Sequence, residues 1–138
     1  MNFRVAIVVA DFNAHVTSLL LEGAQKFLRE QQSKVFHVPG CFEIPVVAQK
    51  LAVSKNYDAI VCLGCVIRGE TPHFEYVCDA VARGVQKISL DTGIPIGFGV
   101  VLAENADQAL DRAGGRHGNK GEEAARAALE TAKVLKEI

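Results

Sequence analysis

The sequence predicts an α/β fold built on a parallel sheet, because buried-strand patterns and helical patterns alternate along its 138 residues. Residues 3–9 and 58–65 are nearly continuous apolar runs, as expected for strands covered on both faces. Residues 34–38 and 95–102 are predicted to be the second and fourth strands. The segments between them place apolar residues at helical spacing. Parallel strands joined in this way need right-handed crossovers, so we expect helices on both faces of the sheet.

Local boundary signals place the helices. We expect them over residues 16–30, in a segment with Pro45 in its first turn, and over residues 74–90, 105–113 and 121–136. Proline is tolerated in a first turn because its missing N–H would be unpaired there anyway. Thr17 or a residue just before it is a candidate N-cap of the first helix. Gly114 and Gly115 should end the fourth helix, and the RHGNKG stretch should be a polar loop.

The most economical arrangement of these elements is a three-layer, flavodoxin-like fold. We predict a four-stranded parallel sheet of order 2-1-3-4, in which ligands bind at the carboxyl ends of the strands. No repeat, low-complexity tract or linker interrupts the chain, so residues 1–138 are expected to form one domain.

Composition and charge exclude several classes of protein. Apolar residues make up 49% of the chain and charged residues 22%, which is typical of a folded globular protein. A formal net charge of −1 gives no global attraction to nucleic acid or to a membrane. The N-terminal apolar run is about half the roughly 20 residues of a membrane span and lacks a signal-peptide pattern, so a cytoplasmic location is expected.

The cysteines and histidines do not predict a metal centre. Cys62 and Cys65 lie at odd spacing in one strand, so their side chains should face opposite sides of the sheet. We interpret the cysteines as small buried residues in a reducing compartment. The other candidate metal ligands are three histidines, His15, His37 and His117. None of them has metal-ligand spacing with a carboxylate.

Loops with unusual chemistry follow the first two strands. Phe12 either stacks on a flat ligand ring or closes the edge of the core, and Asn13 is a candidate helix N-cap. In VPGCFEIP, residues 38–45, Gly40 permits close approach of the backbone to a ligand. The amides placed to bind ring carbonyls are those of Cys41, Phe42 and Glu43. An ordinary turn, with the glutamate favouring the helix dipole, is the competing interpretation.

The stretch LGCVIRGETPHFEYV, residues 63–77, carries the strongest signal. A strand leads into a glycine loop and then to His73 at a helix start. The amides of Gly69, Glu70 and Thr71 suit an anion such as phosphate. Histidine exchanges protons near neutral pH. The competing interpretation is that His73 only starts a helix and that Arg68 in the same stretch is a structural ion-pair residue.

A fourth group combines Phe98, Arg112 and Lys120. Phe98 lies in the middle of a predicted strand, so it could simply pack in the core. Arg112 near a helix C-terminus and Lys120 in a glycine loop could simply interact with the helix dipole and with solvent. As anion binders the cations are more convincing as a pair than singly. The chain has no Walker P-loop, no GxGxxG fingerprint after a strand and no serine in a nucleophile elbow.

Taken in order, these segments resemble the lumazine synthase (6,7-dimethyl-8-ribityllumazine synthase) family. The resemblance covers nearly the whole chain and rests on FN at 12–13, VPGCFEIP at 38–45, LGCVIRGETPHFEYV at 63–77, PxxFGV at 95–100 and DRAGGRHGNKGEEAA at 111–125. It implies the penultimate step of riboflavin biosynthesis, in which 5-amino-6-(D-ribitylamino)uracil condenses with 3,4-dihydroxy-2-butanone 4-phosphate and releases phosphate and water. It also implies that no metal or organic cofactor takes part.

The resemblance further implies a role for each site residue. Phe12 stacks on the pyrimidine, and His73 transfers protons. The butanone phosphate is bound by Glu70 and Thr71, with Arg112 as the cation and Lys120 as a further contact. Phe98 contacts the pyrimidine substrate. Further contacts to the pyrimidine substrate come from Cys41, Phe42 and Glu43 along the ribityl chain, and from the backbone of Cys65, Val66 and Ile67. Phe98, Arg112 and Lys120 match positions that a neighbouring subunit contributes, which implies a homo-oligomer, a pentamer or a multiple of pentamers.

Two other functions compete with this one. A related archaeal-type riboflavin synthase dismutates two lumazines, although the GETPHFEY loop, with amides suited to phosphate and a histidine, argues against it. A non-catalytic flavin or lumazine binder, or a shell-forming structural protein, is the second alternative. The chain also has Asp11 where the family usually has arginine before the Phe-Asn pair.

Overall fold

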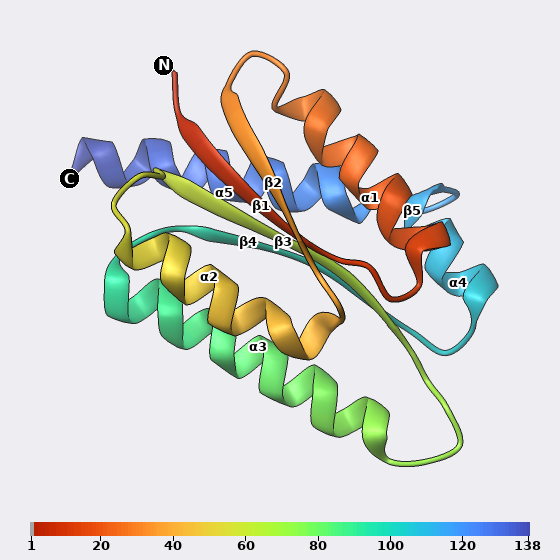
Figure 1. Cartoon of the computed structure of the whole chain (residues 1–138). Helices are drawn as coiled ribbons and strands as arrows, with labels where there is room; N and C mark the ends of the chain where they lie inside the picture. Colours follow the sequence, from red (N-terminus) through yellow and green to blue (C-terminus); the bar gives the residue numbers. More distant parts are fainter. Residues whose placement is uncertain (1) are drawn as a thin grey trace.

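The structure is a computed structural model that describes residues 2–138. Its main sheet has four parallel strands in the order β2-β1-β3-β4, which confirms the predicted topology. The strands are β1 (Arg4–Ala10), β2 (Gln32–Val38), β3 (Ala59–Ile67) and β4 (Ile96–Ala103). In Figure 1 all four point the same way, so their carboxyl ends gather at the end of the sheet opposite the two chain termini.

Helices cover both faces of this sheet, as predicted. Helices α1 (Ala14–Phe27) and α5 (Lys120–Glu137) lie on one face, and α2 (Ile44–Val53) and α3 (His73–Thr92) lie on the other (Figure 1). Because strand side chains alternate between faces, the buried residues form two separate apolar clusters. Cys65 belongs to the cluster beneath α1 and α5, whereas Cys62 belongs to the cluster beneath α2 and α3, which confirms their predicted opposite orientation.

Two glycines allow α5 to pack closely against its neighbours. A Cβ atom added to Gly121 in α5 would lie 2.0 Å from the carbonyl oxygen of Leu20 in α1. One added to Gly97 in β4 would lie 2.0 Å from the carbonyl oxygen of Ala124. These distances are far below ordinary contact, so the face that carries α1 and α5 depends on the absence of both side chains.

The segment before α5 differs from the prediction. Helix α4 (Ala106–Asp111) is shorter than expected, and β5 (Ala113–Gly115) pairs antiparallel with β6 (Gly118–Asn119). The expected polar loop is therefore a small hairpin, in which Gly118 has a φ of 80° that favours glycine. Asn119 then serves as the N-cap of α5, because its Oδ1 accepts the Gly121 amide at 2.8 Å. Its Nδ2 donates to the Leu19 carbonyl at 3.1 Å and ties α5 to α1.

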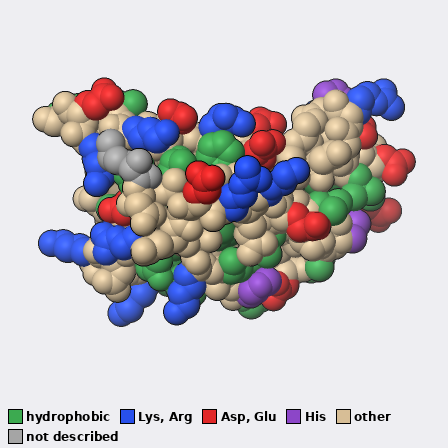
Figure 2. All heavy atoms as spheres, turned by 90° about the horizontal axis from the view of Figure 1, so that it is seen from above, with side chains coloured by type: hydrophobic (Ala, Val, Ile, Leu, Met, Phe, Trp, Pro, Cys, Tyr) green, Lys and Arg blue, Asp and Glu red, His purple; other side chains and the backbone are tan. Residues whose placement is uncertain are grey.

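Within residues 2–138, every helix is too short or too polar to cross a bilayer. Figure 2 shows basic and acidic side chains interspersed on the face seen from above.

Candidate active site

A pocket of about 580 Å³ lies where the carboxyl ends of β1, β2 and β3 meet the start of α3. This is the edge at which parallel α/β sheets bind ligands. Most of its wall is apolar or aromatic, with a few polar groups, as in many small-molecule sites. The lining residues are Phe12, Gly40, Cys41, Phe42, Glu43, Cys65, Val66, Ile67, His73, Tyr76 and Val77.

The loop after β1 exposes an aromatic ring and bridges two strand ends. Phe12 is 71% exposed, so it does not close the core and its ring is free to meet a ligand. Asn13 stands at the N-cap position of α1 with a φ of 63°, but its side chain makes no capping hydrogen bond. Its Nδ2 instead donates to the Cys65 carbonyl at 2.9 Å. Asn13 is therefore the N-cap residue by position, as predicted, but its side chain joins the ends of β1 and β3 instead of capping the helix.

The loop after β2 turns tightly into the next helix. Residues Cys41–Glu43 form a 3₁₀ turn, in which the Glu43 amide donates a hydrogen bond to the Gly40 carbonyl at 3.2 Å. Pro45 then occupies the first turn of α2, as predicted. Phe42 is 64% exposed at the pocket wall. The loop therefore presents a ring and closely spaced backbone groups at the carboxyl end of β2.

The thiols in the pocket wall are apolar at neutral pH. Burial raises the pKa of Cys41 to about 12 and that of Cys65 to about 11. Both side chains are therefore protonated thiols that pack like small hydrophobic groups. All four cysteines are free thiols. Three of them are buried, and Cys78 is partly exposed. Within residues 2–138 no three cysteine, histidine or acidic side chains gather closely enough to hold a metal ion.

His73 is the first residue of α3 and lines the pocket, at the helix start that the sequence predicted. The Gly69–Thr71 segment before it is exposed, with Glu70 and Thr71 outside the pocket wall. The Thr71 hydroxyl accepts the His73 amide at 3.4 Å. These exposed amides precede a helix N-terminus, where an anion is favoured.

Sequence reasoning missed two residues of the wall. Tyr76 and Val77 follow His73 by three and four positions and line the same pocket. That spacing places all three side chains on one face of α3, so helical periodicity would have indicated them.

Arg68 connects three elements beside this pocket. Its backbone amide donates to the Ala103 carbonyl at the end of β4, at 2.9 Å. Its guanidinium forms charged hydrogen bonds with Glu75 in the first turn of α3 and with Glu104 after β4. The same guanidinium lies over the Phe74 ring, 4.4 Å from its centre. These hydrogen bonds raise the pKa of Arg68 and hold the pKa of Glu75 below its ordinary value, so both groups are charged.

Five of the predicted site residues lie outside the pocket wall: Glu70 and Thr71 in the exposed loop before His73, and Phe98, Arg112 and Lys120 elsewhere. Phe98 is half-buried in β4 and packs on the cluster beneath α2 and α3. Arg112 is the C-cap of α4, with Nη1 donating to the Gln108 carbonyl at 3.3 Å, and Lys120 starts α5. Figure 1 shows α4 and β5 on the α1 side of the sheet, across from the start of α3. A single chain therefore does not bring Arg112 to His73.

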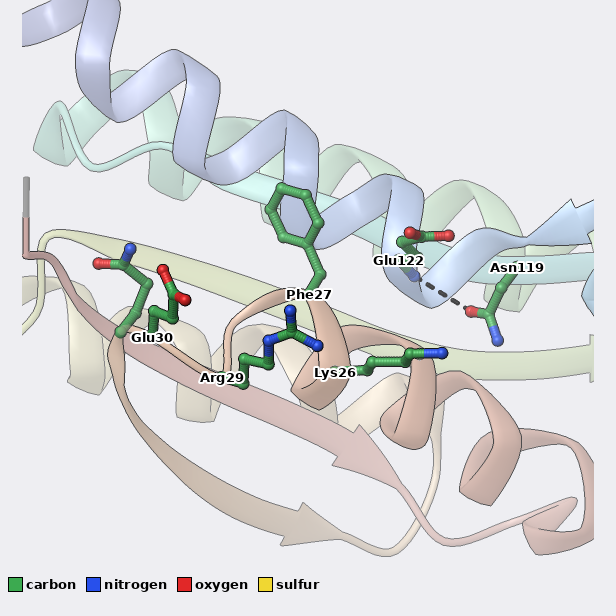
Figure 3. Close-up of a pocket in the computed structure, with 8 residues that line it drawn as sticks. Lys26, Phe27, Arg29, Glu30, Asn119 and Glu122 are labelled. Carbon is green, nitrogen blue, oxygen red and sulfur yellow. Dashed lines mark hydrogen bonds between the residues drawn. The ribbon is translucent and has the colours of Figure 1, made fainter.

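A second hollow, of about 500 Å³, lies between the end of α1 and the start of α5 (Figure 3). Lys26, Arg29 and Glu30 border it, so its charges are mixed. The dashed line in Figure 3 is the 3.1 Å hydrogen bond from the Glu122 amide to Asn119, a helix cap. None of the predicted site residues lies here, so we assign the candidate active site to the pocket at the strand ends.

The fold and this pocket together define a flavodoxin-like α/β protein with a largely apolar pocket at the carboxyl ends of its strands, where such folds bind small molecules. The sequence model of the 6,7-dimethyl-8-ribityllumazine synthase family matches residues 2–136. The chain therefore belongs to this family of transferases, which indicates lumazine synthase activity in riboflavin biosynthesis.

Proposed function

We propose that this chain condenses 5-amino-6-(D-ribitylamino)uracil with 3,4-dihydroxy-2-butanone 4-phosphate to form 6,7-dimethyl-8-ribityllumazine, phosphate and water. One observation carries the proposal. Residues from three strand-end loops that match the family motifs line a single pocket, together with His73. The family match over residues 2–136 supports the reaction class.

The pyrimidine substrate is assigned to the side of the pocket formed by β1, β2 and β3. Phe12 stacks on its ring, and the backbone of Cys65, Val66 and Ile67 binds the polar edge of that ring. The ribityl chain runs along Cys41, Phe42 and Glu43. The exposure of Phe12 and the tight 3₁₀ turn at 41–43 support this assignment, because both present binding groups without rearrangement.

The phosphate of the second substrate is assigned to the exposed Gly69–Thr71 segment. Glu70 and Thr71 offer backbone amides there, and the N-terminus of α3 adds a favourable dipole. Condensation then requires imine formation, loss of phosphate, tautomerisation and ring closure, and each step moves protons. His73 stands between the two assigned substrate regions and serves as the proton-transfer group.

The cation for this phosphate is proposed to come from a second subunit. Arg112 and Lys120, together with Phe98, match the family positions at a subunit boundary, and none of the three lines the pocket of its own chain. A homo-oligomer made of pentamers would bring them to the neighbouring pocket. The site is then complete only at an interface.

Turnover tests the proposal directly. Purified protein mixed with both substrates should produce the absorbing and fluorescent lumazine faster than the uncatalysed reaction does. Incubation with lumazine alone should yield no riboflavin. Absence of any acceleration, with the protein folded, would overturn the proposed reaction, and riboflavin formation from lumazine would favour the dismutation instead.

A further inference from the structure

We propose that Arg68 is a positioning residue that holds the Gly69–Thr71 phosphate segment and the start of α3, and thereby sets the place of His73. This inference rests on the roles given above to that segment and to His73. Arg68 itself is outside the pocket wall and is assigned no contact with substrate.

The loop between Arg68 and His73 has few contacts of its own. Gly69 stands in open space, since an added Cβ would meet no atom within 4 Å. The Thr71 hydroxyl bond to the His73 amide is long, at 3.4 Å, and so is the 3.4 Å bond from the Tyr76 amide to the Pro72 carbonyl. The geometry of the loop must therefore be imposed at its two ends.

Arg68 fixes both ends at once. Its backbone bond to Ala103 extends the β3–β4 pairing by one residue, and its bond to Glu104 holds the guanidinium at that strand edge. The same guanidinium reaches Glu75 and covers the Phe74 ring, both in the first turn of α3. One side chain therefore connects the end of the sheet to the start of the helix that carries His73.

The charges of this cluster favour positioning over anion binding. The guanidinium already faces two carboxylates, so the local charge is net negative and does not attract a phosphate. The side chains are 41–58% exposed, and exposed ion pairs contribute little to global stability. Loss of Arg68 should therefore be visible in kinetics and in local opening of α3, with little effect on overall unfolding.

Arg68→Gln is the main test variant. We expect kcat to fall about tenfold and KM for the butanone phosphate to rise several-fold, because small displacements of a reacting group are costly. KM for the pyrimidine substrate should stay within about twofold, since that substrate is assigned to other loops. The kinetic constants of Arg68→Lys should be intermediate, because a lysine ammonium cannot bind two carboxylates and stack on an aromatic ring at the same time. Adding Glu75→Gln to Arg68→Gln should cause little further loss, since the two act as one unit.

Arg83→Gln provides the matched control. Arg83 also lies in α3, but its partner Asp79 is one turn away in the same helix, at 2.8 Å, and Arg83 is 80% exposed. Its loss should leave kcat and both KM values unchanged. Arg68→Gln kinetics within about twofold of the parent enzyme would overturn the positioning role.

Hydrogen exchange separates this proposal from the proposed reaction. The amides of residues 77–80 bond to the first-turn carbonyls of α3 and should exchange about tenfold faster in Arg68→Gln, but not in Arg83→Gln. This readout needs no substrate. Absence of turnover in the parent protein would overturn the reaction, whereas unchanged exchange would overturn the positioning role.

Discussion

At the scale of single residues, the proposed chemistry divides between a proton carrier and a cation. His73 lies in the pocket wall at the start of α3, and Arg112 lies across the sheet at the end of α4. The two side chains support different parts of the reaction, so their loss should affect different kinetic parameters.

Replacing His73 by alanine should slow the enzyme without abolishing turnover. We expect kcat to fall about 10²-fold, the low end for one acid–base group, while both KM values change little. Alignment of the two substrates remains and keeps the rate above that of the uncatalysed reaction. Steady-state measurement of lumazine formation checks this, with His15→Ala in α1 as control. A drop to the uncatalysed rate would contradict it.

Replacing Arg112 by glutamine should weaken binding of the phosphate substrate. A charge-assisted hydrogen bond contributes roughly 1.5–3 kcal/mol, so KM for the butanone phosphate should rise about 10- to 100-fold. KM for the pyrimidine should stay unchanged. The control is Arg116→Gln in the β5–β6 turn, which removes a nearby exposed arginine of the same charge. Equal loss of affinity in both variants would indicate a general charge effect.

At the scale of elements, the fold depends on the close packing of α5 against α1 and β4, and on an ion pair that joins the starts of β1 and β3. Helix α5 meets α1 at Gly121 and β4 at Gly97, and Asn119 joins α5 to α1 by hydrogen bonds. At the opposite end of the sheet, Arg4 in β1 pairs with Asp58, which comes just before β3. Both features join segments that are distant in sequence.

Gly121→Ala should destabilise the protein by about 1–3 kcal/mol or more, because the new methyl group overlaps the Leu20 carbonyl and α1 must shift. Gly69→Ala is the matched control, since its methyl group meets open space and should change stability by less than about 0.5 kcal/mol. Urea unfolding followed by circular dichroism measures both. Equal midpoints for the two variants would contradict the proposed close packing.

Asp58 should make stability depend on pH. Partial burial raises the pKa of Asp58, but hydrogen bonds from the Arg4 backbone and guanidinium outweigh it, so the pKa lies below the ordinary value of 3.8. The folded state therefore gains stability above pH 3.8, and this gain is lost as the pH falls through the lowered pKa.

Asp58→Asn removes that gain. It should lower the free energy of unfolding by about 1 kcal/mol at pH 7, and the gap from the parent should close as the pH falls below 3.8 and through the lowered pKa of Asp58. Denaturant titrations across pH 2–7 test this. A gap that stays constant with pH would show that the loss does not come from the charge.

At the scale of the whole molecule, the proposed site requires more than one chain. The pocket is lined by His73 and Phe12, whereas Arg112 lies at the end of α4, on the α1 side of the sheet. A pentamer, or a multiple of pentamers, provides a neighbour that can supply the cation.

Mixing two differently impaired variants tests the shared site. When His73→Ala and Arg112→Gln chains are co-assembled, about a quarter of the interfaces should contain both an intact His73 and an intact Arg112. At a butanone phosphate concentration well below KM, the mixture should therefore be more active than either variant alone. Native mass should show a multiple of five chains. A monomeric mass, or a mixture no more active than its parts, would contradict a site shared between subunits.

Much of the fold could be predicted because its signals are local. Nearly continuous apolar runs mark β1 and β3, and Pro45 marks the first turn of α2. The β5–β6 hairpin was not predicted, because two or three residues per strand carry no periodic pattern. The side-chain bond of Asn13 was also missed, because its partner lies 52 residues further along the chain.

The sequence alone determined the α/β class, the strand-end loops and the candidate residues, because periodicity and loop chemistry act over a few neighbouring positions. Only the tertiary structure decided that Phe12, Cys41 and His73 border one pocket, since this depends on β1 lying between β2 and β3. It also decided that Arg112 lies apart from His73 within one chain and that Arg68 joins two strand ends to α3. Such contacts depend on how distant segments pack, which no local pattern encodes.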